Sequence, residues 1–126
     1  MAAIYDISID QGTSFRWSIS VNLNTDPLTP MDLTDYSVAM QVRPDYNKPA
    51  LLSASTTLGN ITFDEGDPTA GTIIVSFTPA DTTPLHYVGD ADTLDCVYDL
   101  EITSIAGTAT RLVQGACSII REVTLT

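Results

Sequence analysis

Residues 14–23 read SFRWSISVNL, and apolar side chains alternate with polar ones along the whole stretch. A β-strand points successive side chains to opposite faces, so this pattern predicts a strand with one apolar and one polar face. The only tryptophan of the chain, Trp17, lies on the apolar face. We therefore expect this strand to organise the core, with Trp17 buried between two sheets. On that interpretation the substitution Trp17→Ala costs about 3–5 kcal/mol of stability.

The same alternation recurs on both sides of this stretch. It predicts short strands over residues 5–9, 36–42, 61–63 and 73–77, with turns rich in Pro, Gly, Asn and Asp between them. Residues 50–52 are a further short strand candidate. Thr78 and Pro79 predict the start of one helical turn, because Thr is a favoured cap and Pro suits the first helical position. Pro84 limits the length of that helix.

The last third of the chain predicts a hairpin with its turn at Ala106-Gly107. A two-residue turn there places Ile102 opposite Arg111 and Cys96 opposite Cys117 on the apolar face. The outer face then carries Asp95, Val97, Asp99 and Glu101 beside Leu112, Gln114, Ala116 and Ser118.

The cysteines are expected to be free thiols, and a strained cross-strand disulfide is the alternative. Val123 and Leu125 continue the alternation and predict a terminal strand.

Together these segments predict an all-β chain that forms one domain over residues 1–126. The expected architecture is an antiparallel two-sheet β-sandwich of about eight short strands, with at most one short helical turn near Pro79. A closed barrel is the alternative. The predicted core consists of Phe15, Trp17, Ile19, Val21, Tyr36, Val38, Met40, Val75, Phe77, Tyr98, Leu100 and Ile102.

The charge balance excludes several classes of partner. Sixteen acidic and five basic residues give a formal net charge of −11. Nucleic acids and anionic membranes require a basic contact surface, so we expect neither as a partner. No apolar run is long enough to span a bilayer, and the first residues do not resemble a signal peptide, so we expect synthesis in the cytoplasm.

No catalytic, cofactor-binding or metal-binding constellation is recognisable. His86 is the only histidine, and with the two cysteines it provides too few ligands for a typical zinc site. Acidic residues at 64–67 and at 90–95 raise the question of calcium, for which Asp90, Asp92 and Asp95 are weak candidates. We expect no enzymatic activity, no cofactor and no metal requirement for folding. A chelator should therefore leave the melting temperature unchanged.

Four motifs, taken in order, resemble a known group of proteins. They are DQGTSF at 10–15, LTDYSVAMQVR at 33–43, YDLEI at 98–102 and RLVQG at 111–115. This series, over about residues 4–125, resembles small β-sandwich virion proteins of tailed bacteriophages and the N-terminal domains of their baseplate, upper baseplate and receptor-binding components. The resemblance implies a non-enzymatic structural component of a virion. It would be an adaptor or attachment module in the tail, baseplate or fibre region, and it would contact other phage structural proteins in multiple symmetric copies.

Four charged residues are candidates for an interface. Arg43 and Arg111 are expected either to form ion pairs within the domain or to anchor a neighbouring subunit. Asp99 and Glu101 belong either to a solvated outer face or to a docking surface for a basic partner. A capsid decoration (cement) protein is the alternative within virions. A carbohydrate-binding module is the alternative from another class, and it requires an exposed aromatic platform.

Overall fold

The computed structural model describes residues 2–23, 27–85 and 92–123, which are mostly β-strand. The strands are β1 (Ala3–Ile4), β2 (Ile7–Asp10), β3 (Phe15–Ser20), β4 (Asn22–Leu23), β5 (Thr29–Pro30), β6 (Ser37–Arg43), β7 (Leu52–Ser55), β8 (Ile61–Phe63), β9 (Thr72–Phe77), β10 (Thr93–Thr103) and β11 (Ala109–Ile120). One short helix, α1 (Pro79–Thr82), and two 3-10 turns, η1 (Asp64–Gly66) and η2 (Pro68–Ala70), complete the elements.

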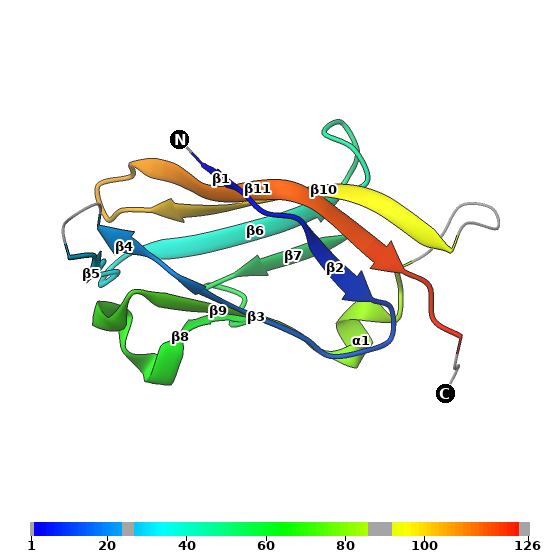
Figure 1. The fold of residues 1–126 in the computed structure, drawn as a ribbon, viewed down its shortest axis with the longest axis horizontal. Coiled ribbons are helices and arrows are strands. Elements are labelled where there is room, and N and C mark those ends of the chain that lie inside the picture. Colours follow the sequence, from blue (N-terminus) through cyan, green and yellow to red (C-terminus); the bar gives the residue numbers. More distant parts are fainter. Residues whose placement is uncertain (1, 24–26, 86–91, 124–126) are drawn as a thin grey trace.

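The described strands form three sheets (Figure 1). The largest has the order β1-β11-β10-β6-β7, and β2 also pairs with β11. The second has the order β3-β9-β8, and β4 pairs with β5 in a small third sheet. Each sheet ends in edge strands, so the closed barrel considered above is wrong for the part of the chain that the structure describes.

The sequence predicted strands β6, β8 and β9, and the structure confirms them. Helix α1 is also confirmed. Its cap is a capping box in which Thr78 and Asp81 each bond the other's backbone N–H, and Pro79 follows the cap. The candidate strand at 50–52 is wrong in position, because β7 begins at Leu52. The predicted terminal strand is wrong at Val123, which is 95% exposed outside any strand, and Leu125 lies outside the described residues.

The β10–β11 hairpin pairs largely as predicted. Cys96 faces Cys117, Tyr98 faces Gly115 and Leu100 faces Val113. The register then shifts, so that Glu101 faces Arg111. This shift is a β-bulge in which Leu112 is the extra residue. The predicted pairing of Ile102 with Arg111 and the predicted two-residue turn are therefore wrong, because residues 104–108 connect the strands.

The outer edge of the large sheet is interrupted at Tyr5 and Asp6. Strands β1 and β2 on either side of this break both pair parallel with β11, so the prediction of a purely antiparallel fold is wrong. The Tyr5 N–H donates to the Gln114 carbonyl at 3.0 Å, and the Ala116 N–H donates to Asp6 Oδ1 at 3.0 Å. The Asp6 carboxylate thus takes the place of a backbone acceptor in the ladder.

The expectation that Trp17 is buried between the two sheets is wrong, because it is only partly buried. Strand β3 lies at the edge of its sheet, and its apolar side chains, like those of Val21 and Tyr36, are only half-buried against the core. The Trp17 ring stacks on Tyr5 with centroids 5.7 Å apart and meets Tyr98 edge-on at 5.8 Å. Because β3 is an edge strand, no neighbouring strand covers one side of the Trp17 ring and its aromatic partners.

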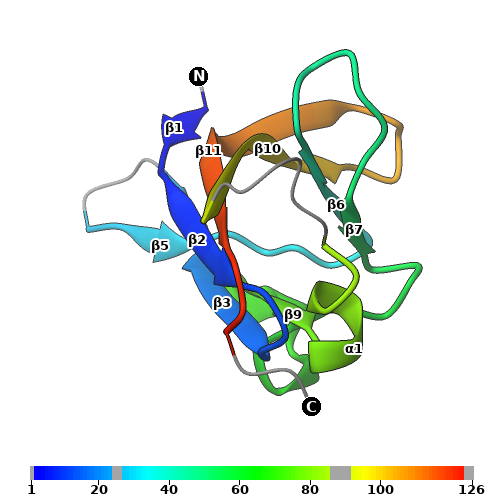
Figure 2. The ribbon, with the colours of Figure 1, turned by 90° about the vertical axis from the view of Figure 1, so that its right-hand side faces the viewer.

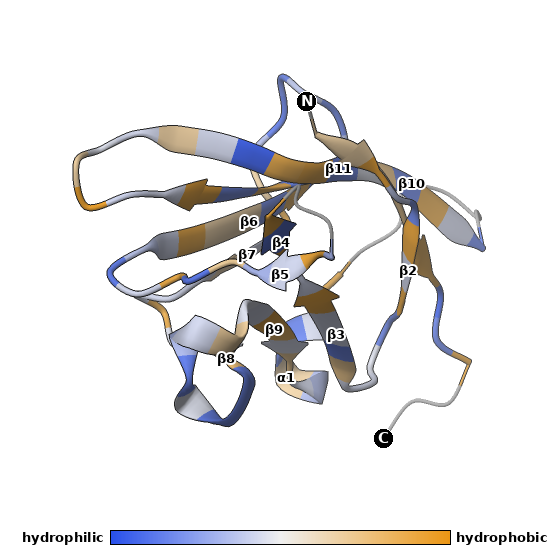
Figure 3. Ribbon diagram, turned by 60° about the vertical axis from the view of Figure 1, so that its left-hand side comes forward, coloured by the Kyte–Doolittle hydropathy of each residue, from blue (hydrophilic) through white to orange (hydrophobic). Residues whose placement is uncertain are grey.

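The core lies between the two larger sheets, and both contribute to it (Figure 2). Seven residues of the predicted core are buried: Val38, Met40, Val75, Phe77, Tyr98, Leu100 and Ile102. The prediction omitted other buried apolar residues, among them Ile9, Leu33, Val42, Ile61, Ile73, Cys117 and Ile119. Figure 3 shows the alternation of hydrophilic and hydrophobic residues along β10 and β11 that directs one face inward.

Gln11 joins three distant segments at one end of the molecule. Its side-chain amide N–H groups donate to the carbonyls of Thr83 at 3.0 Å and Leu85 at 2.7 Å. Its side-chain oxygen accepts from the Glu122 N–H at 3.1 Å. Gly12 follows with φ +81°, a left-handed conformation that glycine adopts without strain, and so turns the chain from β2 into β3.

We predict that Gly115→Ala destabilises the fold. A Cβ atom at this position would overlap the Tyr5 carbonyl oxygen and lie 2.9 Å from Asp6 Oδ1. Relieving that overlap has to displace backbone that is hydrogen-bonded to β11, which costs about 1–3 kcal/mol. Chemical denaturation measures the loss. Ala116→Ser, at the exposed neighbouring position, is the control and should change stability by less than about 0.5 kcal/mol. Equal stabilities of the two variants would contradict the close approach of Tyr5.

The half-buried state of Trp17 revises the expected cost of its removal. Trp17→Ala should cost about 2–3 kcal/mol, because part of the ring already faces water. Trp17→Phe keeps a ring against Tyr5 and Tyr98 and should recover about half of that loss. Denaturation curves give these values. Acrylamide should quench the native fluorescence partially; complete protection from quenching would restore the original prediction of a buried ring.

Candidate functional site

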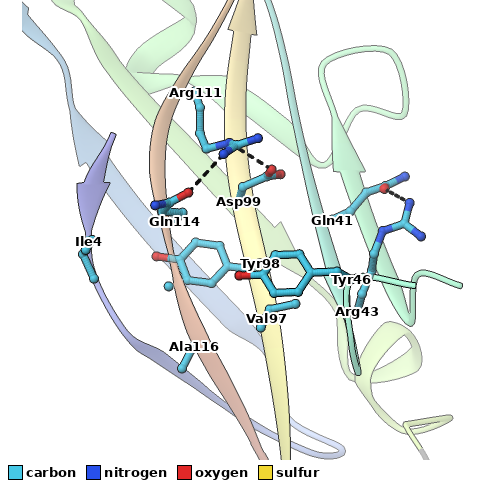
Figure 4. A pocket seen from close by; sticks show the side chains of 11 residues that line it. Ile4, Gln41, Arg43, Tyr46, Val97, Tyr98, Asp99, Arg111, Gln114 and Ala116 are labelled. Carbon is cyan, nitrogen blue, oxygen red and sulfur yellow. Dashed lines mark hydrogen bonds and ion pairs between the residues drawn. The ribbon is translucent and has the colours of Figure 1, made fainter. Parts of the chain in front are cut away.

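A groove with a volume of about 540 Å³ lies on the outer face of the large sheet. We call this surface the outer-face groove (Figure 4). Strands β6, β10 and β11 form its floor, and β1 and the loop after β6 form its sides. Its lining combines two arginines and a carboxylate with apolar side chains, among which Ile4 is 78% exposed and Tyr46 is 81% exposed.

Arg111 lies among three acceptors at one end of the groove. Its Nε is 3.2 Å from Asp99 Oδ2, its Nη2 is 3.8 Å from Glu101 Oε1, and its Nη1 donates to Gln114 Oε1 at 3.1 Å. The β-bulge explains this position, since the shifted register brings Arg111 opposite Glu101. These side chains are between 37% and 50% exposed, so the ion pairs contribute at most about 1 kcal/mol of stability.

Arg43 has different partners at the other end of the groove. Its guanidinium donates to the Lys48 carbonyl at 2.8 Å. It also donates to the side-chain oxygen of Gln41, as Figure 4 shows. Within the described residues no carboxylate lies within ion-pair distance of Arg43. Its positive charge is therefore solvated by neutral oxygens and is open to an incoming anion beside the exposed Tyr46 ring.

The structure thus brings the four predicted interface residues together. Arg43, Asp99 and Arg111 line the outer-face groove, and Glu101 lies just beyond it in a shallow depression that Asp99 also lines. Two roles were considered for the arginines. Arg111 has the first of them, because it forms ion pairs within the domain. The predicted outer face placed Leu112 beside the acidic residues and is wrong at this position, because the bulge brings Arg111 there instead. No pattern in the sequence indicated Tyr46, which lies in a loop without alternation.

A second groove, of about 480 Å³, separates the edge of β3 from β1 and β11. We call it the edge groove. Tyr5, Trp17, Ile19, Val21 and Leu112 line it and make it predominantly apolar. Tyr5 is 56% exposed, although the alternation at residues 5–9 placed it with the buried isoleucines. The break in the edge strand turns its ring away from the core and against Trp17.

No group of three or more potential metal ligands occurs in residues 2–23, 27–85 and 92–123. Of the calcium candidates, Asp92 and Asp95 are exposed, and Asp90 lies outside the described residues, as does His86. The described part of the chain also contains no helix that is long and apolar enough to cross a membrane.

The two cysteine side chains are buried as free thiols on the core side of the hairpin. Burial raises the pKa of Cys117 to about 12, and the neighbouring Cys96 adds to this effect. Burial also raises the pKa of Cys96, with a smaller contribution from Asp95. Tyr98, whose hydroxyl donates to the Tyr5 carbonyl, has a raised pKa for the same main reason. These shifts describe protected core groups rather than activated nucleophiles.

No protein-family model matches the chain, and no curated protein sequence matches it.

We predict that the thiols are protected in the native state and that the fold weakens at alkaline pH. A thiol with a raised pKa favours the folded state fully below the unfolded value near 9, and this contribution is lost as the pH rises toward about 12. Below pH 9, a thiol reagent should label Cys96 and Cys117 only after denaturation. Cys117→Ala should make stability between about pH 9 and 11 less dependent on pH than in the parent. Rapid labelling of the native protein at pH 7 would contradict this arrangement.

Proposed function

We propose that this chain is a non-enzymatic structural component of a bacteriophage virion that acts through protein–protein contacts. It serves as an adaptor or attachment module in the tail, baseplate or fibre region, and its partners are other phage structural proteins. We also propose that its two larger sheets constitute an open β-sandwich, with the β3-β9-β8 sheet packed on the β1-β11-β10-β6-β7 sheet.

One observation carries this proposal: Arg43, Asp99, Glu101 and Arg111 gather on one exposed sheet face beside Tyr46. Arginine and tyrosine are enriched at protein interfaces, where a flat aromatic ring and a multidentate cation give area and specificity. The motif series at 10–15, 33–43, 98–102 and 111–115 supports the virion assignment.

A rigid sheet supports the residues of the outer-face groove. Asp99 and Gln41 face each other across β10 and β6, and Asp99 and Gln114 do so across β10 and β11. Side chains held on paired strands keep their relative positions better than side chains on loops. Such a surface suits an adaptor, which has to present the same contact geometry at every position of a symmetric assembly.

A carbohydrate-binding role is the second candidate, because one observation favours it. Trp17 and Tyr5 form a half-exposed aromatic stack on the edge groove. Aromatic rings at a surface groove are the feature that such a module needs. Titration of the protein with bacterial surface oligosaccharides, with Trp17 fluorescence as the readout, tests this role. Tyr5→Ala removes the stacking partner but keeps the fluorophore, so it serves as the comparison variant.

We predict that the protein occurs in assembled particles at the tail. Mass spectrometry of gradient-purified virions should detect it, and an affinity-tagged copy should be labelled by electron microscopy at the baseplate or fibres. Label distributed over the capsid would instead support the decoration protein. Absence from particles that are otherwise complete would contradict any structural role in the virion.

A further inference from the structure

The outer-face groove carries opposite charges at its two ends. At one end, Asp99 and Glu101 surround Arg111, so two carboxylates and one guanidinium leave one negative charge in excess. At the other end, the Arg43 guanidinium donates to the Lys48 carbonyl, and the Asp45 carboxylate accepts from the Tyr46 N–H. Asp95 also lies on this outer face, two residues before Val97, which pairs with Arg43. Among the described residues no carboxylate lies within ion-pair distance of Arg43, so its guanidinium has no charged partner at this end. The face is therefore complementary to itself.

The rest of the described surface is predominantly acidic. The chain has only five basic residues against sixteen acidic ones; Arg43 and Arg111 line the outer-face groove, and Lys48 lies in the adjoining loop, where its carbonyl accepts from Arg43. Acidic residues dominate elsewhere, for example in the turn η1, which lies on the far side of the molecule from β10 and β11 (Figure 1, Figure 3). Two copies that meet through any such region bring like charges together, which disfavours association.

We propose that the occupant of the outer-face groove is a second copy of this chain, related to the first by a two-fold axis. In an isologous contact each residue pair occurs twice, so the Arg43–Lys48 end of each copy lies against the Asp99–Glu101 end of the other. The exposed side chains of Ile4 and Tyr46 supply apolar area in the same contact. This inference rests on the proposed function. It assigns the docking face of that proposal to contact between two copies of the chain.

Competing occupants fit the charges less well. A strongly basic partner would be repelled by Arg43, which no described carboxylate neutralises. A strongly acidic partner would be repelled by Asp99 and Glu101. A copy of the same face satisfies both ends at once. At about 0.15 M salt the Debye length is about 8 Å, so the repulsion between the distant acidic regions of the two copies is largely screened while direct pairs persist.

A charge-exchange experiment tests the contact. Arg43→Glu with Lys48→Glu makes both ends of the groove negative, and Asp99→Lys with Glu101→Lys makes both ends positive. Sedimentation analysis at about 0.15 M salt should show that the parent dimerises in a concentration-dependent way. Each double variant alone should associate at least about 10-fold more weakly. An equimolar mixture of the two variants should recover association to within a few-fold of the parent, as a heterodimer.

A matched control separates local charge from net charge. Asp64→Lys with Glu65→Lys adds the same charge as Asp99→Lys with Glu101→Lys, but in η1 on the far side of the molecule. This control should dimerise at least as well as the parent. Melting curves verify that each variant is folded, and the single substitutions Arg43→Glu and Glu101→Lys replace any double variant that is not.

Three results would overturn the inference: a parent that stays monomeric up to about 1 mM, variants that dimerise as the parent does, or a mixture that does not associate. Since particle content is measured separately, a monomeric protein that is present in virions refutes only the self-association. A dimeric protein that is absent from virions refutes only the virion role.

Discussion

The pairing of β10 with β11 is the interaction on which the rest of the structure depends. These are the longest strands, and each serves as the template for one half of the large sheet: β6 and then β7 add to β10, and β1 and β2 add to β11. The inward face of the hairpin supplies buried residues that include Tyr98, Leu100 and Cys117. A change in the hairpin register would turn this apolar set toward water and detach both halves of the sheet.

The β-bulge at Leu112 shows how one extra residue decides the chemistry of two surfaces. Without the bulge, Arg111 would face Ile102 on the core side, where an unpaired guanidinium is costly. With it, Arg111 lies beside Asp99 and Glu101 on the outer face. Leu112 itself lines the edge groove with Trp17. One backbone irregularity therefore places Arg111 in the charged groove and Leu112 in the apolar groove.

The two grooves suit different kinds of partner. The outer-face groove lies on hydrogen-bonded strands and carries fixed charges of both signs, which favours a protein surface with matching geometry. The edge groove lies between two sheet edges and presents aromatic and aliphatic side chains. Contact at the first depends on charge arrangement, whereas contact at the second depends on apolar area. Substitutions in one groove therefore leave the main determinants of the other intact.

The sequence by itself determined the local elements, because side-chain alternation is a property of each strand alone: β6, β8, β9, the capped turn at Pro79 and the Cys96–Cys117 pairing were all predictable. It also indicated Arg43, Asp99, Glu101 and Arg111 as candidate interface residues. Only the tertiary structure decided that Trp17 lies at a sheet edge, that β1 and β2 run parallel to β11, and that Arg111 reaches the outer face. These features depend on which distant segments pair and on how closely their backbones approach, as Tyr5 does at Gly115. Alternation within a segment carries no information about such approaches, so the groove that joins Arg43 to Arg111 exists only once the strands are assembled.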